Sequence, residues 1–352
     1  MLQENLTKGR GAQYNPENRF HSNHLAIVHE EGIDTFIDSS VDTQLLPEYP
    51  KKLVNKVESP DVGMLWSVNP YQGCEHGCVY CYARNTHEYW GYSAGLDFES
   101  KIIYKPNAAK LLEAAFKNPS WEPQTISLSG NTDCYQPAER KLKITRALLK
   151  VCLEYRNPVS IITKNNLVLR DIDILEELAS MNLVSVMVSI NGVNERIREK
   201  LEPRTVTYKS RLNVVERLAE RGIPVGVLVA PIIPGLNDHE MPEVLRRASK
   251  AGANNAGYIV LRLNGKVAEI FKDWVYKAFP DRANKILNQV QEIHGGQVND
   301  SRFGTRMKGE GTWSEKLNQL FKITRKKYFE DFTDIPLNTA AFIRNKQLFI
   351  EW

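Results

Sequence analysis

Short apolar runs rich in Val, Ile and Leu alternate, between residues 64 and 280, with longer segments in which apolar residues recur every three or four positions. The short runs predict β-strands, and the longer segments predict amphipathic helices. We expect strands at Leu65–Asn69, Thr125–Ser129, Val159–Thr163, Val184–Ile190, Val225–Ala230 and Gly257–Leu263. We expect helices at Ala108–Phe116, Glu139–Tyr155, Ile172–Met181, Tyr208–Arg221, Glu240–Lys250 and Val267–Phe279.

Strand and helix alternate about every 30 residues without a sequence repeat, which is typical of βαβ units around a parallel sheet. Six such units fit either a doubly wound sheet or a barrel, closed or partial, and the residues alone leave both open. In either architecture, functional side chains gather at the carboxyl ends of the strands. Five polar or glycine-rich segments follow predicted strands and are expected on one face: a cysteine-rich loop, SGNTD, TKNN, Ser189–Asn191 and APIIPG.

The two ends of the chain differ from this pattern. Residues 1–60 are polar with scattered prolines, and they predict an arm and loops with one short strand at Ile33–Ile37. Residues 281–352 hold two helical patterns, NKILNQVQEI and SEKLNQLFKITRKKYF, and a tail, AAFIRNKQLFIEW, that predicts a hairpin around Asn345–Lys346. We therefore expect an N-terminal arm at 1–60, an α/β domain at 61–280 and a C-terminal helical extension at 281–352.

Composition places the chain among ordinary globular proteins, with 352 residues, 42% hydrophobic and 25% charged. The net charge of +4 is compatible with a nucleic-acid partner but does not require one. The longest apolar run, Val225–Ile233, is too short to span a bilayer, and the N-terminus lacks the apolar core of a secretory signal. We expect a cytoplasmic protein with no membrane association, whose five cysteines are reduced.

Three of those cysteines, Cys74, Cys78 and Cys81, lie within eight positions in the loop GCEHGCVYC. Thiolates favour zinc, copper(I) or iron–sulfur clusters. A structural zinc site normally has four ligands in two separated pairs, and here Cys134 and Cys152 lie alone. His76 would be a poor fourth ligand because it sits between two others in a tight loop. A four-iron cluster held by three thiols keeps one iron open for an exogenous ligand.

The C-x3-C-x2-C spacing, with Tyr80 just before the last cysteine, resembles the radical S-adenosylmethionine (SAM) superfamily. The resemblance implies a partial (β/α)6 TIM-type barrel and a [4Fe-4S] cluster on Cys74, Cys78 and Cys81. The open iron would chelate the amino and carboxylate groups of SAM. Reductive cleavage would then release a 5′-deoxyadenosyl radical that abstracts a substrate hydrogen, with an electron donor such as flavodoxin or ferredoxin. Tyr80, otherwise a packing aromatic, would lie against the adenine.

The loop after the second predicted strand is rich in short polar side chains. A plain helix cap would use similar residues, but the resemblance implies that it binds the methionine amino group. Its candidates are Gly130, Asn131, Thr132 and Asp133. Cys134 follows them. It would donate a hydrogen atom to a carbon radical if it faced the cavity, and it would otherwise be a small buried apolar residue, as Cys152 is expected to be.

The later strand ends carry the remaining candidates. A buried Lys164 is costly unless it is paired, and it would otherwise reach solvent. The resemblance implies that Lys164 and Ser189 contact the carboxylate and the ribose of SAM, and that Ala230 and Ile232 pack on its adenine. Arg204 could meet the cofactor, an anionic substrate or only Glu202.

The segments NPYQGCEHGCVYCYAR, NTDCYQPAE, ITKNNLVLRDIDIL, LEPRT and APIIPGLND together resemble the spore-photoproduct-lyase-like group of the superfamily. The opening TKGRGAQYNPENRF resembles the N-terminal arm of an uncharacterised bacterial branch. This resemblance does not identify the substrate. DNA or RNA is the first class to test, since TRKKY at 324–328 mixes cations with an aromatic. A peptide or small metabolite, or a zinc module without catalysis, are the alternatives.

Overall fold

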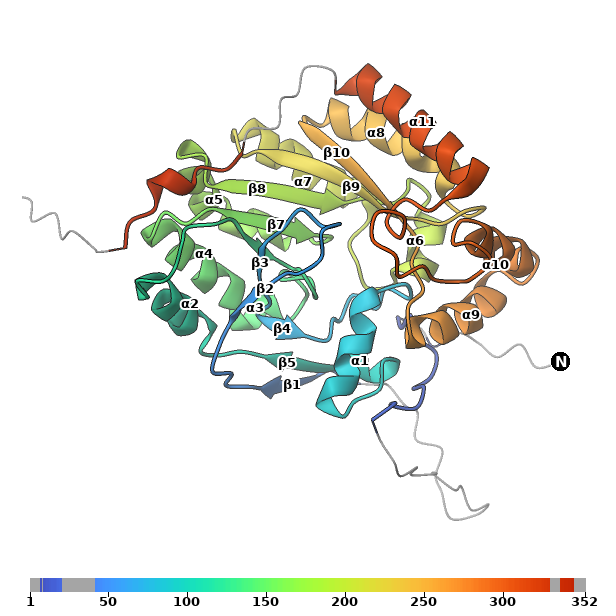
Figure 1. Ribbon diagram of the computed structural model, residues 1–352, viewed down its shortest axis with the longest axis horizontal. Coiled ribbons are helices and arrows are strands. Elements are labelled where there is room, and N and C mark those ends of the chain that lie inside the picture. The colour runs from blue at the N-terminus through green and yellow to red at the C-terminus, as the bar shows by residue number, and fades with distance from the viewer. Residues whose placement is uncertain (1–6, 8, 21–41, 330–335, 345–352) are drawn as a thin grey trace, which may run out of the picture.

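The computed structural model describes residues 7, 9–20, 42–329 and 336–344 (Figure 1). Its main sheet has the strand order β10-β9-β8-β7-β6-β3-β2. All neighbours pair in parallel except β2, which joins the edge antiparallel to β3. The strands are β2 (Val54–Lys56), β3 (Trp66–Val68), β6 (Ile126–Leu128), β7 (Val159–Thr163), β8 (Val184–Ser189), β9 (Val225–Ile232) and β10 (Asn255–Val260).

The strand order distinguishes between the two architectures that the sequence left open. From β3 through β6 to β10, each parallel strand lies beside the one that precedes it along the chain. A doubly wound sheet would reverse this order at a switch point. The α/β fold is therefore of the partial (β/α)6 barrel type, with β10 and β2 at the two edges of the sheet.

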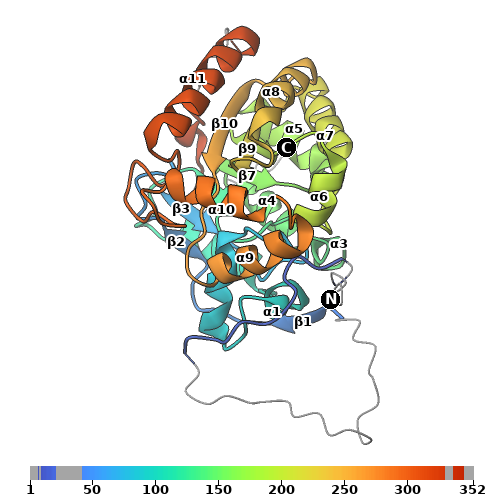
Figure 2. The same ribbon diagram turned by 90° about the vertical axis from the view of Figure 1, so that its right-hand side faces the viewer.

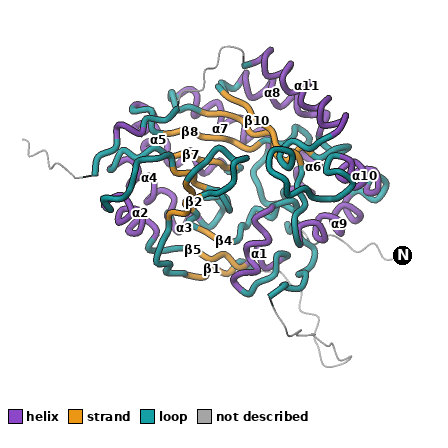
Figure 3. The backbone as a smooth tube through the Cα atoms, viewed as in Figure 1, coloured by secondary structure: helices purple, strands orange, loops and turns teal. Residues whose placement is uncertain are grey.

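Helices follow the strands and cover the sheet from outside (Figures 2 and 3). Val186 of β8, Leu175 of α5 and Val214 of α7 belong to one continuous apolar core, and none of them is exposed. None of the described helices has the length and apolar character needed to cross a bilayer. The helices are α1 (Leu96–Ser100), α2 (Ala108–Lys117), α3 (Glu139–Leu142), α4 (Ile144–Glu154), α5 (Ile172–Ser180), α6 (Glu195–Leu201), α7 (Tyr208–Glu220), α8 (Met241–Lys250), α9 (Lys266–Ala278), α10 (Ala283–Glu292) and α11 (Gly311–Tyr328).

A second sheet lies under the cysteine loop. It consists of β1 (Gln44–Pro47), β5 (Lys101–Tyr104) and β4 (Tyr71–Gln72), in the order β1-β5-β4. The 3₁₀ helix η1 (Tyr82–Trp90) and α1 connect the loop to this sheet. Figure 1 shows the small sheet beside the main one, at the end where β4 leads into the cysteine loop.

Several boundaries differ from the sequence prediction. The expected helix Glu139–Tyr155 is divided at Lys143, whose φ of 52° breaks the helix. This break lets the buried Glu139 carboxylate accept a hydrogen bond from the amide of Thr145 at 3.0 Å. The last strand ends at Val260 rather than Leu263. The predicted strand Ile33–Ile37 and residues 345–352 of the predicted hairpin lie outside the described residues, and the hairpin's first residues are in the 3₁₀ helix Thr339–Ala341.

Candidate functional site

The cysteine loop runs from β4 to η1 and carries Cys74, Cys78 and Cys81. Cys74 and Cys78 are buried, and Cys81 is half-buried. Gly73 and Gly77 have φ values of 76° and 68°, in the left-handed region that favours glycine. A Cβ at Gly73 would lie 2.9 Å from the carbonyl oxygen of Lys101. The loop is therefore wrapped more tightly than side chains would allow at these two positions.

The three thiols share one loop, but they are not arranged around a single metal ion. Around one tetrahedral zinc ion, sulfurs lie about 3.8 Å apart, because each Zn–S bond is about 2.3 Å long. In the described part of the chain, no group of three His, Cys, Asp or Glu side chains is arranged to hold one metal ion. Burial raises the pKa of Cys78 to about 12 and raises the pKa of Cys74 and Cys81, so any metal that these thiols bound would displace their protons.

Gln136 holds the loop in place. Its side-chain amide donates to the carbonyl oxygen of Gly73 at 3.0 Å, and its side-chain oxygen accepts from the amide of Glu75 at 3.0 Å. Gln136 is fully buried. These two bonds flank Cys74 on both sides and tie the cysteine loop to the loop after β6. Sequence reasoning missed this residue, although it lies in the same segment as the predicted cofactor residues.

The loop after β6 places Gly130, Asn131, Thr132 and Asp133 beside the cysteine loop. The side chain of Asn131 donates to Gln72 at 2.7 Å, and that of Thr132 to the carbonyl oxygen of Tyr71 at 2.9 Å. The hydroxyl of Tyr82 donates to the carbonyl oxygen of Gly130. The loop is therefore bonded to both ends of the cysteine loop, near β4 and at the start of η1.

The Asp133 carboxylate is fully engaged within the protein. One oxygen accepts from Thr163 Oγ1 at 2.8 Å, and the other from the amide of Lys164 at 2.8 Å. The second oxygen also lies 3.4 Å from Nδ1 of His76, whose Nε2 lies 3.1 Å from the Asn165 amide. Burial lowers the pKa of His76 to about 4, so its ring is neutral at pH 7. Asp133 thus links the end of β7 to the loop after β6, and both nitrogens of His76 have partners other than the thiols.

Tyr80 and Lys164 face one another above a buried ion pair. The hydroxyl of Tyr80 donates to Glu202, whose other carboxylate oxygen lies 2.5 Å from the Arg211 guanidinium. The Lys164 ammonium lies 5.9 Å from the centre of the Tyr80 ring. Burial lowers the pKa of Lys164, but the neighbouring Cys78, Glu202 and Asp133 outweigh it and leave the pKa raised. Lys164 therefore stays charged, and within the described residues its ammonium makes no direct ion pair.

The candidate cofactor residues at the ends of β8 and β9 differ in how deeply they are buried. Ser189 is buried at the end of β8, and its carbonyl oxygen accepts from Arg211 at 3.1 Å. Near the end of β9, Ala230 is half-buried, whereas Ile232 is only 1% exposed. The guanidinium of Arg204 lies 3.8 Å from Glu75. In the described residues, the acidic group beside Arg204 is thus Glu75, whereas Glu202 pairs with Arg211.

Cys134 lies in the main apolar core and is not exposed. Its amide donates to Ser129 Oγ at 2.8 Å, and its carbonyl oxygen accepts from the hydroxyl of Thr145 at 2.6 Å. This placement favours packing over hydrogen donation, the two alternatives for this thiol. Cys152 is also in the core, which confirms the packing role expected for it.

Comparisons with known proteins agree with this site. The sequence model of the Radical SAM superfamily matches residues 68–248. An uncharacterized protein of Mycobacterium tuberculosis, Rv2578c, is 33% identical over 249 residues, which are 69% of this chain and 72% of the relative. An uncharacterized protein of Methanocaldococcus jannaschii, MJ0683, is 30% identical over 240 residues, with coverage of 68% and 85%.

Similarity extends more weakly to two proteins whose names state a reaction. The Radical SAM Nalpha-GlyT isomerase of Pseudomonas phage M6 is 22% identical over 64% of this chain and 46% of its own length. The structure of spore photoproduct lyase with dinucleoside spore photoproduct superposes with a TM-score of 0.60 at 15% identity, covering 81% of this chain and 79% of the lyase. That likeness shows the fold, and the match over residues 68–248 shows the family. The chain is a member of the radical SAM superfamily.

Proposed function

We propose that this protein reductively cleaves SAM at a [4Fe-4S] cluster held by Cys74, Cys78 and Cys81 and abstracts a hydrogen atom from its substrate. The observation that carries the proposal is the set of three thiols, two buried and one half-buried, on a loop clamped by Gln136. When bound, the cluster and SAM supply a 5′-deoxyadenosyl radical. The residues of the chain bind, orient and shield these groups.

Lys164 is the strongest candidate for holding SAM. Its ammonium is charged, lies beside Tyr80 and has Cys78 as a near neighbour, so a carboxylate at the open iron would neutralise it. Gly130 to Asp133 would bind the amino group through the loop they form, with Asp133 positioning Lys164 through its amide. Ser189 would contact the ribose, and Tyr80, Ala230 and Ile232 the adenine.

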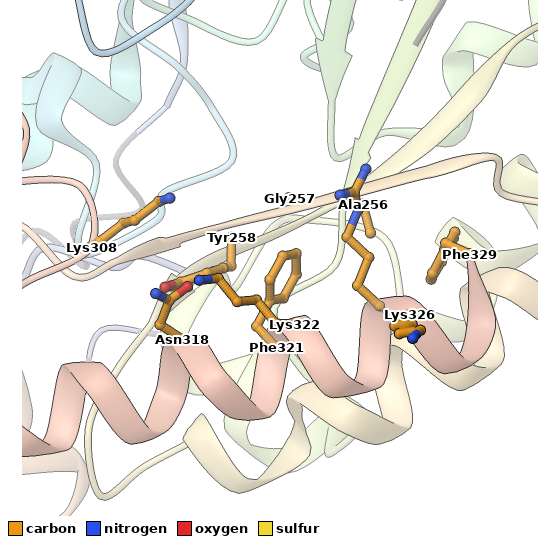
Figure 4. Close-up of a pocket in the computed structure, with 10 residues that line it drawn as sticks. Ala256, Gly257, Tyr258, Lys308, Asn318, Phe321, Lys322, Lys326 and Phe329 are labelled. Carbon is orange, nitrogen blue, oxygen red and sulfur yellow. The ribbon is translucent and has the colours of Figure 1, made fainter. Parts of the chain in front are cut away.

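Nucleic acid is the substrate class that we favour over a peptide or a small metabolite. A groove of about 690 Å³ runs between the edge strand β10 and helix α11. Figure 4 shows the cationic side chains along it. It is lined by Ala256, Gly257, Tyr258, Lys308, Asn318, Phe321, Lys322, Arg325, Lys326 and Phe329. Four of these are cations and none is a carboxylate, which suits a phosphodiester backbone.

Spore photoproduct lyase, which has a similar fold, was solved with a dinucleoside spore photoproduct, and this supports the choice of nucleic acid. A reductant is also required, and we expect an electron-transfer protein of the flavodoxin or ferredoxin type.

Anaerobic reconstitution with iron and sulfide, followed by dithionite and SAM, tests the reaction. Wild type should release 5′-deoxyadenosine, and Cys74→Ala, Cys78→Ala and Cys81→Ala should not. Cys152→Ala is the matched control, because its thiol lies in the core away from the loop. If the reconstituted wild type releases no 5′-deoxyadenosine, the proposed reaction is wrong.

Salt-dependent binding tests the substrate class. Lys308→Glu and Lys322→Glu should weaken binding of DNA or RNA, and each should reduce the slope of log K against log salt by about 0.7–0.9 for every phosphate that is no longer neutralised. Lys316→Glu is the control, since Lys316 is exposed on the same helix but does not line the groove. Equally weakened binding in Lys316→Glu and Lys322→Glu would mean that the groove is not the binding surface.

A further inference from the structure

The N-terminal arm lies against the cysteine loop on the side of Gly77 and Val79, which we call the back of the loop. In Figure 1 it lies beside α1 and α9. Ala12 is fully buried and packs against Ala94 and against Ile270 of α9. Hydrophobic patterning gives no hint of this position, because the arm and the cysteine loop are far apart along the chain.

A single buried carboxylate joins the arm to the loop. Glu99, fully buried, accepts from the amide of Gly11 at 3.1 Å and from the amide of Ala12 at 2.8 Å. It also forms an ion pair with the buried guanidinium of Arg84. Arg84 Nε in turn donates to the carbonyl oxygen of Cys78 at 3.0 Å. The arm is therefore connected through Glu99 and Arg84 to one of the three clustered cysteines.

The arm and the loop approach each other too closely for side chains. A Cβ at Gly11 would lie 1.7 Å from the carbonyl oxygen of Gly77, and a Cβ at Gly77 would lie 2.9 Å from the Glu99 carboxylate. Since the backbone of the arm meets the backbone of the cysteine loop here, a larger residue at Gly11 must displace the arm. The close approach is specific to glycine at both positions.

Further contacts hold the rest of the arm to the same region. The Asp97 amide donates to Asn15 Oδ1 at 2.9 Å, and Ser93 Oγ donates to the Pro16 carbonyl oxygen at 2.6 Å. The amide of Arg19 donates to the buried Glu88 at 3.1 Å. These partners all lie between residues 88 and 97, just after the cysteines. None of the arm residues 9–20 belongs to the main core of the barrel.

We propose that residues 10–19 form a latch that closes the back of the cysteine loop and protects its thiols, while the barrel folds without them. The latch acts by fixing the Glu99 carboxylate with two amide hydrogen bonds. Glu99 in turn holds Arg84 against the carbonyl oxygen of Cys78. Without the arm, Glu99 keeps Arg84 but loses two amide donors, so the loop opens more often. The protective role of the latch toward a cluster rests on the proposed function, but its protection of the thiols does not.

Thiol alkylation of the metal-free protein tests the latch. Gly11→Val should raise the rate at which iodoacetamide modifies Cys74 and Cys78 by at least about tenfold. A tenfold change corresponds to about 1.4 kcal/mol, and each of the two amide hydrogen bonds that the charged Glu99 would lose contributes at least that much. Tyr14→Ala is the matched control. The ring of Tyr14 is exposed, and only its backbone carbonyl oxygen, which the substitution keeps, lies close to Gly95. Cys152, in the barrel core, serves as the internal reference in each sample.

The outcomes separate the latch from the fold and from the proposed reaction. Equal alkylation of Cys74 in Gly11→Val and wild type would overturn the latch. Equal acceleration at Cys152 would also overturn it, because the arm would then support the whole fold. In reconstituted protein, Gly11→Val should lose cluster absorbance to a ferrous chelator faster than wild type. A wild type that takes up no iron would refute the proposed function, whereas the alkylation result would still stand.

Discussion

At the scale of single residues, several polar side chains around the site are buried. For one of them, His87, the effect of burial on the free energy of unfolding can be measured. His87 is fully buried, with its ring edge-on to Phe98 at 5.6 Å between centres. Burial lowers the pKa of His87 to about 4, whereas in the unfolded chain it is about 6.5. Between these two values the unfolded state binds more protons, so stability must fall as the pH falls.

We therefore expect the free energy of unfolding to decrease from about pH 6.5 toward pH 4, with His87 contributing at most about 1.4 kcal/mol per pH unit. His87→Phe should reduce this dependence, although His76 will preserve part of it. Urea unfolding at about pH 7 and about pH 5, on either side of the ordinary histidine pKa, measures the difference. His239→Phe is the control, since that ring is 71% exposed. An unchanged pH dependence in His87→Phe would contradict the assignment.

Gln136 offers a second test at this scale. Gln136→Glu keeps the oxygen that accepts from the Glu75 amide but loses the donor to the Gly73 carbonyl oxygen. We expect a loss of about 1–3 kcal/mol in the free energy of unfolding, because a buried acceptor is left without its partner. Iron bound per chain after reconstitution should fall with it. Gln124→Glu is the matched control, since only the backbone oxygen of Gln124 accepts from Asn157 in the described structure. Equal effects of the two substitutions would refute the clamp.

At the scale of elements, the regular alternation of apolar runs with amphipathic helical segments predicted the six parallel strands of the main sheet, including β3 and β6 with only three residues each. It missed β1, β2, β4 and β5, which lie outside that alternation. Of these, β1, β4 and β5 exist because each pairs with another that is distant along the chain, as β1 does with β5.

Helix α11 is the element whose docking is easiest to test. The ring of Phe321 lies 4.6 Å from that of Tyr258 on β10, and Phe321 is 9% exposed. We expect Phe321→Ala to lower the free energy of unfolding by about 3 kcal/mol through loss of buried area and the cavity left behind. Denaturant titration measures it. Ile323→Ala is the control on the same helix, because Ile323 is 68% exposed, and a similar loss there would argue against specific docking.

At the scale of the whole molecule, β10 is an edge strand of the main sheet, partly covered by α11 and by the segment before it, where the carbonyl oxygen of Met307 accepts from the amide of Val260 at 3.0 Å. Truncation after His294 would remove both this segment and α11 and uncover the strand edge beside Tyr258. Exposed edges promote pairing with other chains, so we expect self-association, seen by size-exclusion chromatography with light scattering. Truncation after Arg344 retains α11 and should leave the protein in its original state. If the protein truncated after His294 remained monodisperse and kept the wild-type state of association, a protective role for α11 would be refuted.

The sequence by itself determined the parallel α/β architecture and the positions of the cysteine loop and of the polar strand ends, because these follow from local spacing. Only the tertiary structure decided the sequential strand order, the clamp by Gln136, the burial of Cys134 and the path of the arm. Each of these depends on contacts between residues far apart in the chain. Gly11 shows the reason. Only glycine fits at this position because Gly77 and Glu99 lie so close to it, and both are far from Gly11 in the sequence.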